Sequence, residues 1–332
     1  MVCSCLVCLR PTAIKMYMAT YQLSGVKVLV TGARGFIGSH LCDALRRMGA
    51  EVHAVSRGLH SGGELHWWQA NLTDIGTVRK LLTDIRPEIL FHLSGHVTAA
   101  PNLEFTLSTF DSHVVSTVRL LTAATEIGCK RVVLTASLTE PQGSASKVVP
   151  SSPYAAAKWM SCAYGRMFHA LYQTPVTIVR PFMAYGPMQN TQKIIPYVAL
   201  SLLRGETPKL ASGRWQADWI YIDDVIEGIL AAACLPGVEG STIDLGSGIM
   251  IPVREVVDQV VTLVGTSIKP AFGALPDRPA EEIRAADLAY AQDRLGWRPA
   301  TSLEEGLART VAWYREQRRA PASLFNQKEE LR

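Results

Sequence analysis

The stretch Val26–Leu41, which reads V-K-V-L-V-T-G-A-R-G-F-I-G-S-H-L, decides how the rest of the chain is organised. It opens with an apolar, β-branched run that is typical of a strand buried on both faces. Three glycines follow at a spacing of three residues, and an apolar stripe with helical spacing comes after them. The segment is therefore predicted to fold as a strand, a glycine-rich turn and a helix.

Each of the three glycines has a physical reason to occupy its position. Gly32 lets the chain turn sharply out of the strand, Gly35 leaves room for a pyrophosphate, and Gly38 lets the helix pack closely on the sheet. The helix N-terminus at Phe36 and Ile37 offers free N–H groups and a partial positive charge to a phosphate. We therefore predict a dinucleotide-binding turn, although its spacing differs from the commonest G-x-G-x-x-G. The alternative is a glycine-rich turn without a ligand.

Composition narrows the class of protein. The chain has 332 residues, of which 48% are hydrophobic and 19% charged, as expected for a well-cored globular protein of two domains. A net charge of +4 without a basic stripe does not favour nucleic acid as a partner. No apolar run reaches membrane-spanning length, and the seven cysteines lack the spacing of a metal site. We expect a cytoplasmic protein with free thiols, no membrane partner and no metal.

Strand-like and helix-like segments alternate along most of the chain, which predicts an α/β fold with a doubly wound parallel sheet and a smaller C-terminal α/β lobe. Residues 26–182 are expected to form the nucleotide-binding (Rossmann) domain, rejoined by about 217–247. Residues 183–216 and 248–320 are expected to form a substrate-binding lobe. We expect residues 1–25 to be a disordered extension and residues 321–332 to be a loose tail.

Three details of the expected helices depend on local signals. Thr73 is expected to cap the helix that carries Val78 and Ile85. A single long helix is expected over residues 103–127. Asp223 and Asp224 are expected to cap the helix that runs to residue 235.

Small or polar residues follow the expected strands where a dinucleotide would lie. Ser56 and Arg57 follow the second strand, where NAD-binding folds carry an acidic residue for the adenine ribose. A small residue and a cation suit a 2′-phosphate better, so we expect NADP rather than NAD. The alternative is an arginine that only faces solvent. Further cofactor contacts are expected at the ends of the later strands, at Asn71, Leu72, Leu93, Ser94, Gly95 and Pro181.

A possible proton-transfer set lies around the fifth strand. Tyr154 and Lys158 are spaced i, i+4, so both side chains lie on one helical face. The ammonium is expected to lower the tyrosine pKa from about 10, so that the phenol exchanges a proton with a sugar oxygen. Ser137, at the end of the preceding strand, could hold the same oxygen. The alternative is an exposed helical pair. His96 is a weaker candidate at the fourth strand.

These segments resemble the motifs of extended short-chain dehydrogenase/reductases, in the NAD(P)-dependent sugar epimerase/dehydratase family. The resemblance runs from about Val26 to Tyr314. Its motifs are specific for the superfamily but not for a substrate. The matching segments are Thr31–Gly38, Ser152–Lys158, Arg180–Pro187, Asp218–Asp224 and Leu295–Pro299.

The resemblance implies catalytic roles for Ser137, Tyr154 and Lys158, a nucleotide-diphosphate sugar as substrate, and a homodimer formed through two long helices, here residues 103–127 and 153–172. By position it also implies substrate contacts from Lys193 and Arg278, the latter gripping the diphosphate. Further substrate contacts are expected around the site, from His96, Ser137, Thr139, Met183 and Arg214.

The chain also departs from the family pattern. Ala217 replaces an arginine that contacts the diphosphate, unless Arg214 takes over, and Met183 and His113 stand where asparagines are usual. Dehydratases carry Asp-Glu directly after the catalytic residue, but Leu138 and Thr139 follow Ser137 here, and Glu140 comes one position late. Because dehydration needs a placed acid and base, these changes argue against 4,6-dehydratase activity.

Three functions from two classes therefore remain open, and within the enzymes the changes at Ala217 and Met183 also leave open a substrate that is not a nucleotide sugar. The first is an NADPH-dependent reductase that delivers hydride to C4 of a nucleotide-linked 4-keto-6-deoxy sugar, with Tyr154 as the proton donor. The second is an NAD(P)-dependent nucleotide-sugar 4-epimerase. The third is a non-catalytic NADP-binding scaffold, against which the intact tyrosine and lysine speak.

Overall fold

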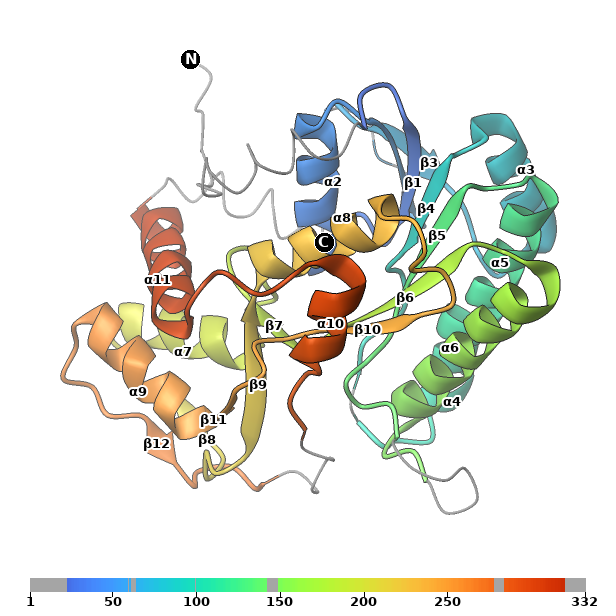
Figure 1. Ribbon diagram of the computed structural model, residues 1–332. Helices are drawn as coiled ribbons and strands as arrows, with labels where there is room; N and C mark the ends of the chain where they lie inside the picture. The colour runs from blue at the N-terminus through green and yellow to red at the C-terminus, as the bar shows by residue number, and fades with distance from the viewer. Residues whose placement is uncertain are drawn as a thin grey trace.

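The computed structural model describes residues 23–58, 60, 64–98, 100–141, 149–277 and 284–319. Its centre is a seven-stranded sheet in the order β10-β6-β5-β4-β1-β2-β3, and every pairing in it is parallel (Figure 1). This confirms the predicted doubly wound α/β fold. The strands are β1 (Lys27–Thr31), β2 (Glu51–Ser56), β3 (His66–Gln69), β4 (Ile89–His92), β5 (Arg131–Thr135), β6 (Val176–Pro181) and β10 (Thr242–Leu245).

Helices cover both faces of this sheet (Figure 1). Val28 and Val30 of β1 pack into one core with the helices of the first face, and Leu29 packs into a second core on the opposite face. The strand is apolar throughout because both of its faces are buried. The first face carries α2 (Phe36–Arg47) and α8 (Ile222–Cys234), and the second carries α3 (Ile75–Ile85), α5 (Ser116–Glu126) and α6 (Pro153–Tyr172).

Two small sheets and three helices form a lobe beside the carboxyl ends of the strands (Figure 1). The three-stranded sheet has the order β11-β9-β7 and the two-stranded sheet pairs β12 with β8. The strands are β7 (Met183–Tyr185), β8 (Lys209–Leu210), β9 (Gln216–Tyr221), β11 (Met250–Pro252) and β12 (Ala271–Phe272). The lobe helices are α7 (Ile194–Leu203), α9 (Val253–Val264) and α11 (Leu303–Arg319), whereas α10 (Leu288–Leu295) packs against β10 and α8.

Two of the expected helix caps are wrong. Asp74, not Thr73, caps α3, because its carboxylate accepts the Thr77 N–H at 2.6 Å. Asp223 and Asp224 lie inside the first turn of α8, where carboxylates are stabilised by the helix dipole. There they bind the C-terminal part of the chain: the Asp223 carboxylate pairs with Arg309 at 2.7 Å, and Asp224 accepts two backbone N–H groups.

The expected single helix over residues 103–127 is also wrong in detail. The chain forms α4 (Phe105–Thr109), a π-helical turn over Phe110–Val115, and then α5. A π turn adds a residue to the helix, which changes the direction of the side chains that follow. It is this turn that carries His113.

The described cysteines are all free: Cys42, Cys129 and Cys162 are buried, and Cys234 is half-buried. Across the described ranges, no three or more His, Cys, Asp or Glu side chains are grouped so that they could hold a metal ion. No helix among the described residues is both long enough and apolar enough to cross a membrane.

Candidate active site

The glycine-rich turn joins β1 to α2 without a side-chain cap on the helix. Gly32 has a φ of +71°, and a Cβ there would lie 2.8 Å from the Ser94 backbone nitrogen. A Cβ at Gly38 would lie 2.1 Å from the Gly32 carbonyl oxygen, so the helix approaches the turn too closely for any side chain. The Gly35 N–H donates to the Gly32 carbonyl at 2.9 Å and closes the turn, so the pyrophosphate contact that the sequence predicts is left to the N–H groups at the start of α2.

The parallel sheet brings the predicted cofactor residues to one edge, since every strand of it ends on the same side. Leu93, Ser94 and Gly95 follow β4, beside the end of β1. Pro181 is the last residue of β6, and Asn71 and Leu72 follow β3.

At the far end of this edge lie the residues expected to choose between NADP and NAD. The Ser56 hydroxyl donates to the Gly58 carbonyl at 2.6 Å, and Arg57 is exposed. Sequence reasoning missed two neighbours. Arg34 Nη1 lies 3.0 Å from His60 Nε2, and Arg34 Nη2 is buried with no hydrogen-bond partner among the described residues. The sequence did contain a signal for Arg34, because this residue lies inside the predicted dinucleotide-binding glycine motif.

Ser137, Tyr154 and Lys158 come together at the end of β5. Ser152 caps α6 by accepting the Ala155 N–H at 3.2 Å, and this start places Tyr154 and Lys158 one turn apart. The Tyr154 and Ser137 side chains lie near each other, and the Ser137 hydroxyl acts to lower the pKa of the Tyr154 phenol. Lys158 is buried, and its Nζ donates to the Thr135 carbonyl at 2.8 Å.

The expected lowering of the tyrosine pKa is wrong for this structure. Burial raises the pKa of Tyr154 to about 12, and the Ser137 hydroxyl only partly opposes that rise. Burial also lowers the pKa of Lys158, whose ammonium is directed at the Thr135 carbonyl. Tyr154 is therefore a protonated phenol at neutral pH in this structure.

Two histidines beneath the site are neutral. His92 Nδ1 lies 2.8 Å from the Thr31 hydroxyl and Nε2 3.0 Å from the Thr117 hydroxyl, and burial lowers the pKa of His92 to about 3. Burial, followed by the charge of Lys158, lowers the pKa of His113 to about 3. Both rings are therefore uncharged at neutral pH.

His113 touches two parts of the candidate site. Its Nε2 donates to the His96 carbonyl at 3.0 Å, and its ring packs edge-on against Tyr154 with centroids 5.3 Å apart. Gly95 makes room for it, because a Cβ there would lie 1.9 Å from His113 Cε1. The His96 ring itself is exposed and lies beside Phe105. From the sequence, His113 was noted only because it stands where the family usually has an asparagine, whereas the structure packs its ring against Tyr154.

The residues expected to contact the substrate lie in different parts of the fold. Thr139 is beside the site, with its hydroxyl 2.9 Å from Ser137 Oγ. Met183 is half-buried at the start of β7, directly after β6. Lys193 precedes α7 in the lobe, and Arg214 is an exposed lobe residue that pairs with Asp277 at 3.5 Å. Arg278 lies outside the described residues.

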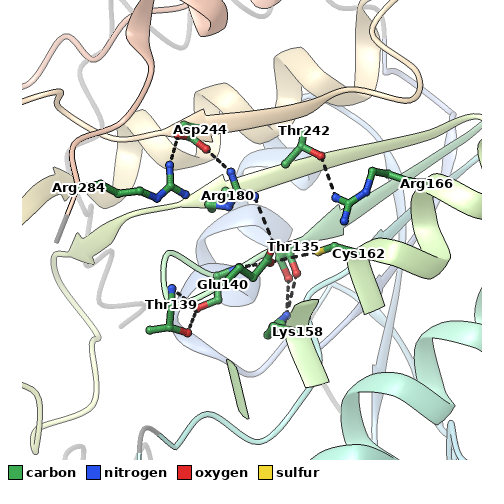
Figure 2. Close-up of polar contacts among 11 residues, drawn as sticks. Thr135, Thr139, Glu140, Lys158, Cys162, Arg166, Arg180, Thr242, Asp244 and Arg284 are labelled. Atoms are coloured by element: carbon green, nitrogen blue, oxygen red, sulfur yellow. Dashed lines mark hydrogen bonds and ion pairs between the residues drawn. The ribbon is translucent and has the colours of Figure 1, made fainter. Parts of the chain in front are cut away.

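Glu140 is not placed as a free acid near the substrate side. It is buried, and its carboxylate pairs with Arg180 at 3.3 Å (Figure 2). Both of its oxygens are engaged, since Oε1 accepts the Ser137 N–H and Oε2 pairs with Arg180, so it is not free to reach a substrate. This arrangement agrees with the absence of the Asp-Glu pair that dehydratases carry.

Comparisons with known proteins identify the same family. The profile of the NAD dependent epimerase/dehydratase family matches residues 28–246. The UDP-glucose 4-epimerase of Mycolicibacterium smegmatis is 31% identical over 313 residues, which cover 87% of this chain and 99% of that protein.

Solved structures of similar proteins share the fold. The UDP-glucose 4-epimerase of Thermotoga maritima, in its complex with UDP-glucose, has a TM-score of 0.79 at 26% identity, over 87% of this chain and 99% of that one. MoeE5 in complex with UDP-glucose and NAD has a TM-score of 0.77 at 29% identity, over 88% and 99%. The chain therefore belongs to the NAD-dependent epimerase/dehydratase family of NAD(P)-dependent, oxidoreductase-type enzymes.

Proposed function

We propose that this protein is an NAD(P)-dependent 4-epimerase of a UDP-sugar. The observation that carries the proposal is the joined set of Ser137, Tyr154 and Lys158 beside a Glu140 that is bound to Arg180. Such a site can move a proton at a sugar hydroxyl but lacks the free acid that dehydration needs. The likeness to UDP-glucose 4-epimerases along nearly their whole length supports the same choice.

The residues divide the work as follows. Bound NAD(P) would accept the hydride of C4 and return it to the other face of the sugar. Tyr154, which is protonated at neutral pH in this structure, must first lose its own proton, and the positive charge of Lys158 favours the phenolate. The phenolate then takes the proton of the C4 hydroxyl and returns it when the sugar is reduced again, while Ser137 holds the oxygen. The sugar must rotate between the two transfers, so its contacts in the lobe have to be weaker than those of its nucleotide.

We further propose NADP as the preferred cofactor, with NAD as the alternative. Arg34, Arg57 and His60 place cationic and donor groups near the end of β2, where no carboxylate follows the strand. The buried Arg34 Nη2 lacks a partner among the described residues, which suits a phosphate oxygen. MoeE5 is known with NAD, so this preference has to be measured.

The arginines near the end of β2 also favour a second candidate. A reductase of a nucleotide-linked 4-keto-6-deoxy sugar exchanges its cofactor in every cycle, and NADPH is suited to that use. The same three residues would serve, with Tyr154 as the proton donor, which fits its raised pKa.

The partner would be a second copy of the chain. The residues before α4, α4 itself and the neighbouring helix α6 expose large apolar side chains, which are 86% exposed at Leu103, 77% at Leu107 and 40% at Met160. An exposed apolar face of this kind marks an interface. Sedimentation velocity should give a dimer, and Leu107→Lys should shift it to a monomer; a monomeric wild type would contradict the proposal.

The deciding experiment titrates the purified protein with NADPH, NADP, NADH and NAD, and then supplies UDP-glucose, UDP-glucuronic acid and 4-keto-6-deoxy sugar nucleotides. Interconversion of two UDP-sugars epimeric at C4, without net change in cofactor absorbance, establishes the epimerase. Stoichiometric NADPH oxidation on a keto sugar would instead establish the reductase. Binding of cofactor without turnover of any sugar would contradict both the epimerase and the reductase proposals.

A further inference from the structure

Four charged side chains form a chain that leads away from the candidate site (Figure 2). Glu140 Oε2 pairs with Arg180 at 3.3 Å, Arg180 pairs with Asp244 at 2.7 Å, and Asp244 pairs with Arg284 at 2.9 Å. The two carboxylates are buried, with side chains 2% and 6% exposed. Because acids and bases alternate, the chain is neutral as a whole, which offsets the cost of desolvating each charge.

At the end of this ion-pair chain nearest the site, Glu140 makes two hydrogen bonds with the backbone of Ser137. The Ser137 N–H donates to Glu140 Oε1 at 2.9 Å, and the Glu140 N–H donates to the Ser137 carbonyl at 3.1 Å. Both polar backbone groups of Ser137 are therefore fixed by one residue. This leaves only χ1 free to direct the hydroxyl towards Tyr154 and Thr139.

Glu140 also touches the helix that carries the tyrosine and lysine. Cys162 lies one turn beyond Lys158 on the same face of α6, and its thiol donates to Glu140 Oε1 at 3.2 Å. Burial and the nearby carboxylate raise the pKa of Cys162, so the thiol keeps the proton that it donates. One carboxylate thus joins the turn after β5 to the catalytic face of α6.

The other end of the ion-pair chain, at Asp244 and Arg284, lies in another part of the fold. Asp244 belongs to β10, and the Arg284 guanidinium lies over the Phe182 ring at 4.9 Å, next to Met183. Residues far apart in sequence therefore hold Glu140 in place. A lone buried glutamate would not keep this position, because it would be uncompensated.

We propose that Glu140 is a positioning residue, which sets Ser137 against Tyr154 and Lys158 and is itself held by Arg180, Asp244 and Arg284. It does not exchange protons with the substrate, because both of its oxygens are engaged by protein donors. The inference rests on the proposed function in that Ser137 must act on the sugar oxygen.

The test uses two double variants that both stay neutral. Glu140→Gln/Arg180→Met keeps an acceptor for the Ser137 N–H, whereas Glu140→Leu/Arg180→Met removes it at similar volume. Misplacing a catalytic group by about an ångström costs on the order of 100-fold, so we expect the Leu variant to lose about 30-fold in kcat with KM within about twofold. The Gln variant should recover most of that loss.

A second measurement does not need turnover. Hydrogen exchange at the Ser137 amide should become faster in the Leu variant and stay protected in the Gln variant, because Glu140 Oε1 is its acceptor. The matched control is Arg79→Met/Glu126→Leu, which removes an exposed ion pair far from Ser137 in sequence and should change neither quantity. If the Leu variant fails to fold, Glu140→Asp, which keeps the charge but shortens the reach, is tested in its place.

Equal kcat and equal exchange in the Leu and Gln variants would overturn the positioning role. So would a change in only one of the two quantities, since the proposal links the Ser137 backbone to catalysis. If the wild type interconverts no UDP-sugar, the proposed epimerase fails, and the exchange of the Ser137 amide alone then decides whether Glu140 holds it.

Discussion

The two halves of the candidate site are built in different ways. The cofactor half, around β1, β2 and the glycine turn, is shaped by backbone: its defining contacts are those between Gly38 and the Gly32 carbonyl. The catalytic half, around β5, β6 and β10, is shaped by side chains, with Glu140, Arg180 and Asp244 linked by ion pairs.

This difference explains which half of the site can be predicted from the sequence. Backbone geometry is local, so the cofactor half needs one contiguous motif, Thr31–Gly38. An ion-pair chain is assembled by the fold from residues spread over more than a hundred positions. The first half tolerates little change in shape, whereas the second tolerates little change in charge.

The largest effect should come from the catalytic half, on activity alone. Tyr154→Phe should lower kcat by about 10³-fold, because the proton-transfer group is lost. Stability should hardly change, since the ring keeps its edge-on contact with His113. Steady-state kinetics and thermal melting separate the two, with Tyr164→Phe, a partly exposed tyrosine on the same helix, as the control. Retained activity would remove Tyr154 from the mechanism.

The next effect should come from the cofactor half, on stability and cofactor binding together. Gly38→Ala should destabilise the fold by about 3 kcal/mol, because the new Cβ meets backbone that cannot move aside. Urea unfolding and cofactor titration measure both losses. Gly76→Ala in α3 is the control, since its Cβ meets nothing closer than 3.4 Å and alanine favours helix. A harmless Gly38→Ala would contradict a backbone-shaped site.

The boundary between the halves should give a pH effect. His92 has a pKa of about 3 when folded, against about 6.5 when unfolded, so the unfolded chain binds protons first as the pH falls. Stability should therefore drop below pH 6.5, by about 2 kcal/mol at pH 5 from this group. His92→Gln should flatten the drop in melting temperature between pH 7.5 and 5. An unchanged pH profile would show that other groups cause the acid sensitivity.

The smallest effect should come from a side chain within the backbone-shaped half. Arg57→Ala should weaken NADP binding by about fivefold and leave NAD binding unchanged, because an exposed charge contributes less than about 1 kcal/mol. Isothermal titration with both cofactors measures the ratio. Lys80→Ala, an exposed cation on α3, is the control. Equal losses for both cofactors would argue against a 2′-phosphate contact.

The sequence alone was enough to predict the parallel sheet, the family and the meeting of Ser137 with Tyr154 and Lys158. Each of these depends on periodicity or on a short motif. The cap at Asp74 and the π turn before α5 were missed because they are decided by one residue of register.

The pKa of Tyr154 and the position of Glu140 were missed for another reason. Burial, not the spacing to Lys158, dominates the tyrosine pKa, and burial depends on the whole fold. Glu140 could be read only as a displaced acid, because its partner Arg180 is forty residues away along the chain.

The contact between Gly95 and His113 has a consequence for which residue position 95 can hold. As long as an imidazole fills the space where a Cβ would stand, no side chain at position 95 can be tolerated. Gly95 also has a φ of +146°, a backbone conformation that side chains rarely adopt, so position 95 stays closed to other residues even after His113 is replaced. The backbone and the imidazole therefore both keep this position a glycine.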